Sequence, residues 1–429
     1  MAVLMSSCNT KGATEIVDAT INENGELVLV YSNGSEKNLG AVVGKDGSDG
    51  ADGKDGVDGS DGSVSVEGTD GSVSIASSKG LRSAVSIVCN FQATVQQGGW
   101  RPGSGSTTTK NYASAGSGVI YQMDKSTGDA FIITNYHVVY DASSNTENGI
   151  SNDISVYLYG AEIEEKAIKA TYVGGSLYYD IAVLRVEDSE ILKESSACAV
   201  DIADSDKVAV GESAIAIGNA QGYGISTSCG IVSVDSEYIT MIAADGKTTV
   251  SFRVMRVDTA VNSGNSGGGL YDSRGYLIGI VNAKIVDDGV ENIGYAIPSN
   301  VAVSIAENII DYCYGKNEER VQRALIGITV NSLDSGAVYD PETGLIFIRE
   351  TVSVYEISEN SLSSDVLKVG DVLLSATLDG KTTEITRQYH IIDMMLDVRE
   401  GDVVSFEILR NGEKTTVQIT ITKDCLTEY

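Results

Sequence analysis

The sequence predicts a mainly β protein in which a β-barrel or β-sandwich is followed by a smaller α+β unit. From about residue 80 to residue 312, short runs of β-forming residues alternate with Gly, Asn, Asp and Ser, a pattern typical of all-β barrels and sandwiches. From residue 322 onwards, strand-like runs surround one stretch whose apolar residues recur at helical spacing. With 429 residues, the chain is long enough for two or three domains.

The N-terminal residues resemble the end of a bacterial lipoprotein signal, in which small residues precede a cysteine that takes a lipid. Ser6 and Ser7 precede Cys8, so we interpret residues 1–15 as the remnant of a signal or anchor and Cys8 as a lipid-anchor candidate. The alternative is an ordinary N-terminus with an incidental cysteine. No stretch of the sequence reaches the length of a transmembrane helix.

Two short segments follow. Residues 16–43 alternate apolar and polar side chains around the turn signals at Asn24 and Asn33, which predicts a small β-hairpin region. Gly then recurs at every third position from Gly44 to Gly62, the period of collagen, and the run resembles the collagen-like stalks of bacterial surface proteins. Because the run is short and has no Pro, a flexible acidic linker over residues 44–79 is the favoured alternative.

The net charge argues against nucleic acid and anionic membranes as partners, and the cysteine spacing argues against a cysteine metal site. The 60 acidic and 30 basic side chains give a net charge of −30, which argues against binding to nucleic acid or to an anionic membrane. The cysteines lie far apart and have no metal-ligand spacing. Cys89 and Cys229 lie in apolar, strand-like runs and are predicted to be buried thiols, whereas disulfides among the others stay open. The six cysteines are Cys8, Cys89, Cys198, Cys229, Cys313 and Cys425.

The central segment, residues 80–315, is predicted to hold most of the strands. The helix predicted there spans residues 301–312 and follows Ser299, a capping candidate. The strands are predicted at 84–88, 118–121, 130–134, 154–159, 181–186, 213–217, 230–234, 251–254 and 276–281.

The C-terminal segment, residues 322–424, is predicted to form a separate α+β unit. Its helix is expected near residues 388–398, where Ile391, Met395 and Val398 share one face and are expected to be core residues. Its strands are predicted at 344–349, 372–376, 403–409 and 415–421. His390 is expected to be an exposed helix residue, with a residue that lines a binding groove as the alternative.

Three residues of the central segment form a candidate catalytic set. The chain has two histidines, and His137 is the one outside the C-terminal segment, so it is the candidate general base. Ser266 lies between glycines that let the backbone turn tightly and present N–H groups to an oxyanion, which makes it the candidate nucleophile. Asp180 opens an apolar strand, where burial requires a partner such as an imidazole N–H; the alternative is a solvent-facing strand cap.

Residues 80–425 resemble the HtrA (DegP-like) family of trypsin-fold serine proteases with a C-terminal PDZ domain. The resemblance lies in three motifs that occur in the order His, Asp, Ser. They are TNYHVV at 134–139, YDIAVL at 179–184 and DTAVNSGNSGG at 258–268, with support from IGN at 217–219, GIVS at 230–233 and IGYAIPS at 293–299.

The resemblance implies two six-stranded β-barrels with the catalytic residues between them. It implies His137, Asp180 and Ser266 as the triad and an oxyanion hole at Gly264, Asn265 and Ser266, with the N–H groups of Gly264 and Ser266 as donors. The family usually has Pro where Ser263 stands, and Gly269 also departs from the pattern. We therefore expect this loop to be less ordered at rest and to need a partner to hold its active shape.

The resemblance also indicates where a substrate binds. The pocket floor lies six residues before the nucleophile, at Ala260, with Val281 and Asn282 on the opposing strand. None of them is charged, so the pocket is expected to accept small apolar side chains with little discrimination.

The C-terminal unit resembles a PDZ domain. Its carboxylate-binding loop is expected at Leu325, Ile326, Gly327 and Ile328, with a bound peptide adding as a strand beside it.

Together these features predict a serine endopeptidase that degrades unfolded proteins outside the cytoplasm, as a secreted or cell-surface bacterial protein. A protease that cuts one signalling target and a surface-attached binding or holdase scaffold with little proteolysis stay open as alternatives. The resemblance implies a homotrimer and no metal, nucleotide or organic cofactor. The acidic charge predicts no nucleic-acid partner.

Overall fold

The computed structural model describes residues 16–24, 26–41, 73–97, 106–283, 293–314 and 321–428. The chain divides into two units, Met1–Ser65 and Val66–Tyr429. Cys8 and the Gly-X-Y run between Gly44 and Gly62 lie outside the described residues. The lipid-anchor and stalk predictions are therefore not addressed by the structure.

The described part of the first unit is a three-stranded antiparallel sheet in the order β1-β2-β3. Its strands are β1 (Ile16–Ile21), β2 (Glu26–Tyr31) and β3 (Glu36–Ala41). Gly34 has a φ of +80° in the turn between β2 and β3, a conformation that favours glycine. The predicted hairpin is thus extended by a third strand.

Two closed six-stranded barrels form the centre of the second unit. The first has the order β4-β5-β6-β9-β8-β7 and the second the order β10-β11-β12-β15-β14-β13. Every strand predicted in the central segment falls on one of these, and each barrel has its own buried apolar core. The first barrel consists of β4 (Ala84–Gln97), β5 (Ser106–Asp124), β6 (Asp129–Thr134), β7 (Asp153–Leu158), β8 (Ile168–Ser176) and β9 (Ile181–Val186). The second consists of β10 (Ser213–Gly218), β11 (Ser226–Ile242), β12 (Thr249–Val257), β13 (Gly269–Tyr271), β14 (Leu277–Val281) and β15 (Gly294–Pro298).

The C-terminal part is an α+β unit, so the predicted fold class is confirmed. Its main sheet has the order β17-β18-β19-β21-β22, and β20 pairs with β19. A helix, α5 (Tyr389–Asp397), contributes Ile391 and Met395 to the core of this unit, as predicted. The strands are β16 (Gln322–Ala324), β17 (Ile328–Tyr339), β18 (Ile346–Ile357), β19 (Val372–Leu378), β20 (Lys381–Glu384), β21 (Val403–Arg410), β22 (Glu413–Thr420) and β23 (Leu426–Glu428).

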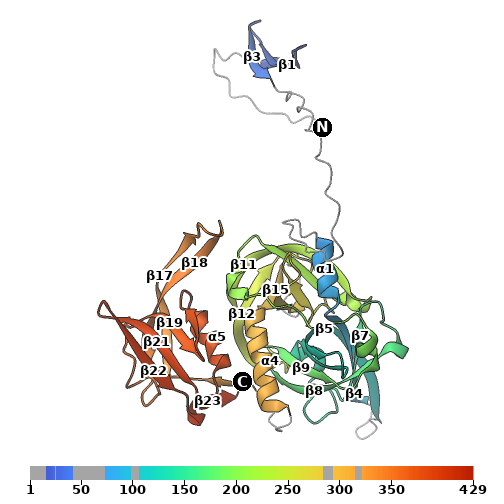
Figure 1. Ribbon diagram of the computed structural model, residues 1–429. Coiled ribbons are helices and arrows are strands. Elements are labelled where there is room, and N and C mark those ends of the chain that lie inside the picture. The colour runs from blue at the N-terminus through green and yellow to red at the C-terminus, as the bar shows by residue number, and fades with distance from the viewer. Residues whose placement is uncertain are drawn as a thin grey trace, which may run out of the picture. The chain divides into compact units, whose positions relative to one another are not determined.

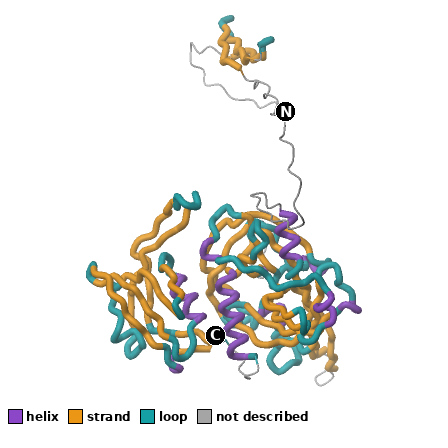
Figure 2. The backbone as a smooth tube through the Cα atoms, viewed as in Figure 1, coloured by secondary structure: helices purple, strands orange, loops and turns teal. Residues whose placement is uncertain are grey.

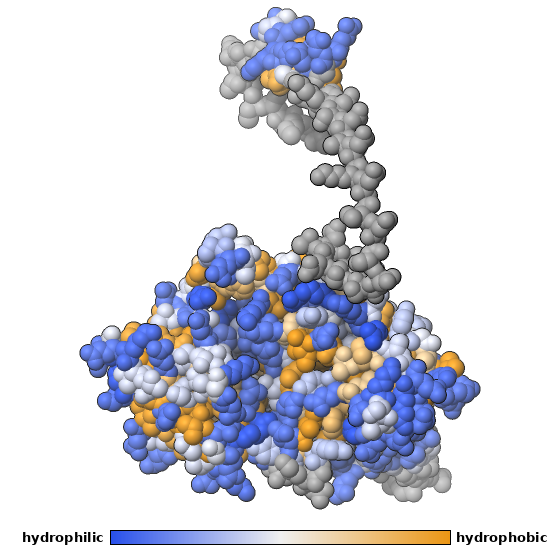
Figure 3. All heavy atoms as spheres, viewed as in Figure 1, coloured by the Kyte–Doolittle hydropathy of each residue, from blue (hydrophilic) through white to orange (hydrophobic). Residues whose placement is uncertain are grey.

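Strands dominate both parts of the second unit (Figure 2). The helix α4 (Ser299–Cys313) packs on β8 and β9 of the first barrel, on β14 of the second and on α5 of the C-terminal part (Figure 1). Hydrophilic residues cover most of the face seen in Figure 3, as expected of an acidic chain. No helix among the described residues combines the length and apolar character needed to cross a membrane.

Four local predictions were wrong. Helix α1 (Val73–Leu81) packs on β10 and β13, so the folded part begins before the predicted linker ends at residue 79. Cys229 of β11 is exposed, whereas Cys89 is buried as predicted. No disulfide joins the five described cysteines. The other two wrong predictions concern Ser299 and His390.

Ser299 is not a helix cap, because its Oγ donates to the carbonyl of Ala203 at 2.8 Å and the N-cap position belongs to Pro298. His390 is half-buried rather than exposed, and its Nδ1 accepts a hydrogen bond from the N–H of Thr386 at 3.2 Å. Burial lowers the pKa of His390.

Candidate active site

His137 is the second residue of a short helix, α2 (Tyr136–Val139), that begins just after the end of β6. Its Nδ1 lies 2.6 Å from Oδ2 of Asp180, and its backbone N–H donates to Oδ1 of the same carboxylate at 2.9 Å. The amide of Asn135 also donates to the carbonyl of Asp180, at 2.8 Å. The backbone and the side chain of His137 are therefore both hydrogen-bonded to Asp180, which fixes the orientation of the imidazole ring.

Asp180 is buried between the end of β8 and the start of β9, and it is not the solvent-facing cap of the alternative interpretation. Its φ is +56°, in the left-handed region that residues with a side chain rarely adopt. Such strain persists where surrounding contacts impose it and is common at functional sites. The three hydrogen bonds from Asn135 and His137 are contacts of this kind.

Asn282 holds the second side of the carboxylate, a role that the sequence analysis did not predict. Its Nδ2 donates to Oδ2 of Asp180 at 2.8 Å, and the residue has no exposed surface. Val281 is also buried, within the core of the second barrel. Of the three predicted pocket residues only Ala260 is exposed. Val281 and Asn282 do not line a pocket: Val281 belongs to the core, and Asn282 supports the Asp180 carboxylate. Val281 is the last residue of β14 and Asn282 follows it, so their side chains point to opposite sides, one into the core of the second barrel and one to Asp180.

Ser266 is linked to the Asp180 site through Ala283, the residue that follows Asn282. Its Oγ accepts a hydrogen bond from the N–H of Ala283 at 3.3 Å, and its carbonyl accepts one from the N–H of Ser117 at 2.8 Å. Gly267 packs against the His137 segment, because a Cβ there would lie 3.0 Å from the nitrogen of Asn135. Among the described residues, Ser266 and His137 share no hydrogen bond, which is common before a substrate binds.

The N–H groups around Ser266 divide into two sets. Those of Asn265, Gly267 and Gly268 donate to the carbonyls of Asn262, Val281 and Asn265 at 3.0, 3.0 and 2.9 Å. Within the described residues, those of Gly264 and Ser266 donate to no other group. Two neighbouring unpaired N–H groups are what an oxyanion hole requires. The inclusion of Asn265 in the oxyanion hole is therefore corrected, because its N–H already donates to the carbonyl of Asn262.

Hydrogen bonds link the loop to neighbouring segments, and its need for a partner stays a prediction. Besides the bonds above, the carbonyl of Ser263 accepts the N–H of Gln221 at 2.7 Å, and the carbonyl of Gly264 accepts the hydroxyl of Ser117 at 2.7 Å. Hydrogen bonds thus replace the rigidity that a proline at position 263 would supply.

Comparison with known proteins relates the chain to peptidases. The family described as "Trypsin-like peptidase domain" matches residues 116–280. The chain is 32% identical over 349 residues to the serine protease Do-like HtrA of Bacillus subtilis (strain 168), which covers 80% of this chain and 71% of the relative. This chain belongs to the HtrA family of serine proteases.

Two further HtrA relatives resemble the chain. The periplasmic pH-dependent serine endoprotease DegQ of Escherichia coli (strain K12) is 30% identical over 315 residues, which cover 71% of this chain and 59% of DegQ. The solved structure of the HtrA-type protease AlgW with decapeptide has a TM-score of 0.48 and 24% identity, and the match covers 82% of this chain and 98% of AlgW. As a member of the HtrA family, this chain is a serine endopeptidase.

The predicted carboxylate loop of this HtrA chain lies between β16 and β17. Ile326 is buried, Leu325 is half-exposed and Gly327 has a φ of +82°, where an added Cβ would lie 2.1 Å from Cβ of Ser361. Within the described residues, the N–H groups of Ile326 and Gly327 donate to no other group, whereas that of Leu325 donates to Cys425. Ile328 begins β17, which is an edge strand of its sheet.

Polar contacts join the C-terminal part to the barrels. Arg253 of β12, almost fully buried, forms ion pairs with Asp206 at 2.9 Å and with Asp393 of α5 at 2.7 Å. Burial raises the pKa of Asp393 to about 7, although Arg253 opposes the rise. Arg323 of β16 donates to the hydroxyl of Tyr179 at 2.9 Å. The C-terminal part thus contacts the residue directly before Asp180.

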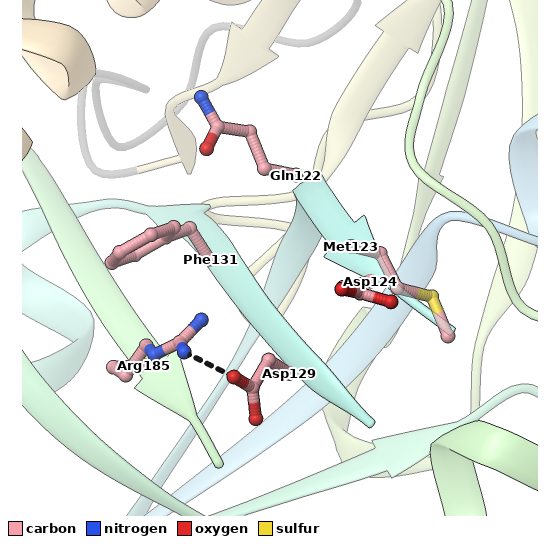
Figure 4. Close-up of a pocket in the computed structure, with 6 residues that line it drawn as sticks. All are labelled: Gln122, Met123, Asp124, Asp129, Phe131 and Arg185. Carbon is pink, nitrogen blue, oxygen red and sulfur yellow. Dashed lines mark hydrogen bonds and ion pairs between the residues drawn. The ribbon is translucent and has the colours of Figure 1, made fainter. Parts of the chain in front are cut away.

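A cavity of about 300 Å³ on the first barrel is separate from this site (Figure 4). Arg185 dominates its wall, where the guanidinium pairs with Asp129 at 2.6 Å and lies 4.7 Å from the centre of the Phe131 ring. Its charge is therefore satisfied, and none of the candidate catalytic residues lines the cavity.

Proposed function

We propose that this endopeptidase cleaves unfolded or misfolded proteins outside the cytoplasm, with Ser266, His137 and Asp180 as its catalytic triad. The observation that carries the proposal is the 2.6 Å contact between His137 Nδ1 and Asp180 Oδ2, joined to Ser266 through Asn282 and Ala283. An extracytoplasmic site of action is supported by the similarity to periplasmic DegQ.

In this mechanism, Ser266 Oγ attacks the carbonyl carbon of the scissile peptide bond while Nε2 of His137 takes the hydroxyl proton. Asp180 stabilises the resulting imidazolium and keeps Nδ1 protonated. The N–H groups of Gly264 and Ser266 donate to the oxyanion. The imidazolium then gives its proton to the leaving amine, and a water molecule, deprotonated by His137, releases the peptide acid from Ser266.

The substrate class follows from the exposed Ala260, which supplies no charge to pair with a basic or acidic side chain. An apolar site discriminates weakly between similar side chains, so many exposed segments of an unfolded chain qualify. Hydrolysis of unfolded casein by the wild type, lost in Ser266→Ala, tests the assignment.

We also propose that the C-terminal part is a PDZ domain that captures the C-terminal end of a protein. The N–H groups of Ile326 and Gly327 are available to a carboxylate, and β17 offers a sheet edge to which a peptide can add as a strand. The contact between Arg323 and Tyr179 supports control of the Asp180 loop by such a peptide.

A free carboxylate is therefore expected to be required for this binding. A fluorescein-labelled peptide ending in valine should bind at least about tenfold more tightly than the same peptide with a C-terminal amide, since the amide loses the charge-assisted hydrogen bonds. Fluorescence anisotropy with the Ser266→Ala protein measures this without cleavage. Equal affinities would contradict the carboxylate loop.

The assembly proposed for this chain is a homotrimer, as the family resemblance implies. Sedimentation velocity at micromolar concentration is expected to show a species of about three times the chain mass of 45.1 kDa. A stable monomer under these conditions would refute it. Lipid attachment at Cys8 and a collagen-like arrangement of the three Gly-X-Y segments are further proposals, with the acidic linker as the alternative for the latter.

A further inference from the structure

We infer that Ser117 is a positioning residue for the oxyanion hole, because its hydroxyl connects the nucleophile loop to the turn at residues 219–222. The inference rests on the proposed role of Gly264 and Ser266 as the oxyanion donors. Ser117 lies in β5, has no exposed surface, and is far from Ser266 in the sequence.

The hydroxyl of Ser117 makes two short hydrogen bonds. It donates to the carbonyl of Gly264 at 2.7 Å and accepts the N–H of Asn219 at 2.7 Å. The backbone of Ser117 adds a third link, since its N–H donates to the carbonyl of Ser266 at 2.8 Å. One residue thus holds the loop on both sides of Asn265.

Peptide geometry explains why this matters for the N–H of Gly264. In a planar trans peptide, the N–H points opposite to the preceding carbonyl. The carbonyl of Ser263 is directed to the N–H of Gln221, at 2.7 Å, so the N–H of Gly264 points away from the 219–222 turn. The peptide plane on the other side of Gly264 is held by Ser117.

Gly264 is the joint between these two planes. Its φ is +94°, a region open to glycine, and an added Cβ would lie 2.2 Å from the carbonyl oxygen of Asn219. Glycine leaves the backbone free to rotate, so the orientation of the N–H depends on what holds the two planes. The Ser117 hydroxyl is the side-chain contact on the plane that follows Gly264, and the N–H of Gln221 is the contact on the plane that precedes it.

The turn to which Ser117 connects the loop is itself anchored. The side-chain amide of Asn219 donates to Oγ of Ser86 at 2.6 Å, and its Oδ1 accepts the N–H of Gly224 at 2.8 Å. The hydroxyl of Ser117 therefore joins Gly264 to a part of the fold that has further hydrogen bonds of its own.

Removing the hydroxyl has two consequences. The buried N–H of Asn219 and the buried carbonyl of Gly264 lose their partner, which destabilises the local structure. The peptide between Gly264 and Asn265 is then held only through the N–H of Asn265, so Gly264 can rotate and its own N–H is aligned with the oxyanion for only part of the time. Stabilisation of the transition state falls while substrate binding is unchanged.

The test compares Ser117→Ala with Ser299→Ala, using a peptide substrate and a peptide boronic acid that mimics the tetrahedral state. Ser299 is a matched control, since its buried hydroxyl also donates to a backbone carbonyl, at 2.8 Å. For Ser117→Ala, kcat should fall by about tenfold to a hundredfold with KM unchanged, and the boronic acid should bind more weakly by a similar factor. Ser299→Ala should keep both values, with a comparable fall in melting temperature.

The inference is overturned if Ser117→Ala keeps kcat, or if its boronic acid affinity is that of the wild type. If Ser117→Ala does not fold, Ser86→Ala takes its place, because it loosens the turn at Asn219; it should lower kcat by a smaller factor, and an unchanged kcat would overturn the inference. A wild type without Ser266-dependent hydrolysis would instead refute the proposed function, and this inference with it.

Discussion

Replacing Ser266 by alanine is expected to lower kcat for unfolded casein by on the order of a million-fold, the usual effect of removing a triad nucleophile. Alanine has no oxygen to form the acyl-enzyme, and only the oxyanion donors and substrate binding remain. Release of fluorescent peptides from labelled casein measures the loss. Because Ser266 is buried and small, the substitution should leave the melting temperature within a few degrees of the wild type.

Ser299→Ala serves as the control here too, and it should retain the activity of the wild type. A fluorophosphonate probe should label Ser266 in the wild type and leave the Ser266→Ala protein unlabelled. Equal casein hydrolysis by wild type and Ser266→Ala would show that another residue is the nucleophile or that the casein is cut by a contaminant.

The second large effect is expected for Asp180→Asn, which should lower kcat by on the order of 10⁴. The Asp180 carboxylate accepts three hydrogen bonds, from the backbone N–H of His137, from its Nδ1 and from Nδ2 of Asn282. An amide has one acceptor oxygen, so at least one donor must face its NH₂ group. When that donor is Nδ1, the imidazole takes the wrong tautomer and Nε2 cannot accept the Ser266 proton.

Asp272→Asn provides a matched control for the loss of a buried carboxylate. Asp272 is as buried as Asp180, accepts the N–H groups of Arg274 and Tyr276, and pairs with the Arg274 side chain at 2.6 Å. Its partners are not those of the triad, so Asp272→Asn should lower stability and keep kcat. An Asp180→Asn protein with less than a tenfold loss of kcat would remove Asp180 from the triad.

Much of the fold could be predicted from local patterns. The strands that were found, such as β9 (Ile181–Val186), are predominantly apolar runs that are easy to recognise in the sequence. The strands that were missed have weak local signals: β13 has only three residues, and β8 ends in Gly174-Gly175-Ser176. Their conformation comes from pairing with neighbours that are distant in the sequence, which no local window contains.

The sequence by itself was enough to predict His137, Asp180 and Ser266 as the catalytic set, because each lies in a short motif whose residue types suit that chemistry. Only the tertiary structure decided what surrounds them. Asn282 donates to the Asp180 carboxylate, and the Ser117 hydroxyl donates to the loop that carries Ser266. The physical reason is that a hydrogen bond depends on angstrom-scale placement of two groups, and only closure of the two barrels sets that placement.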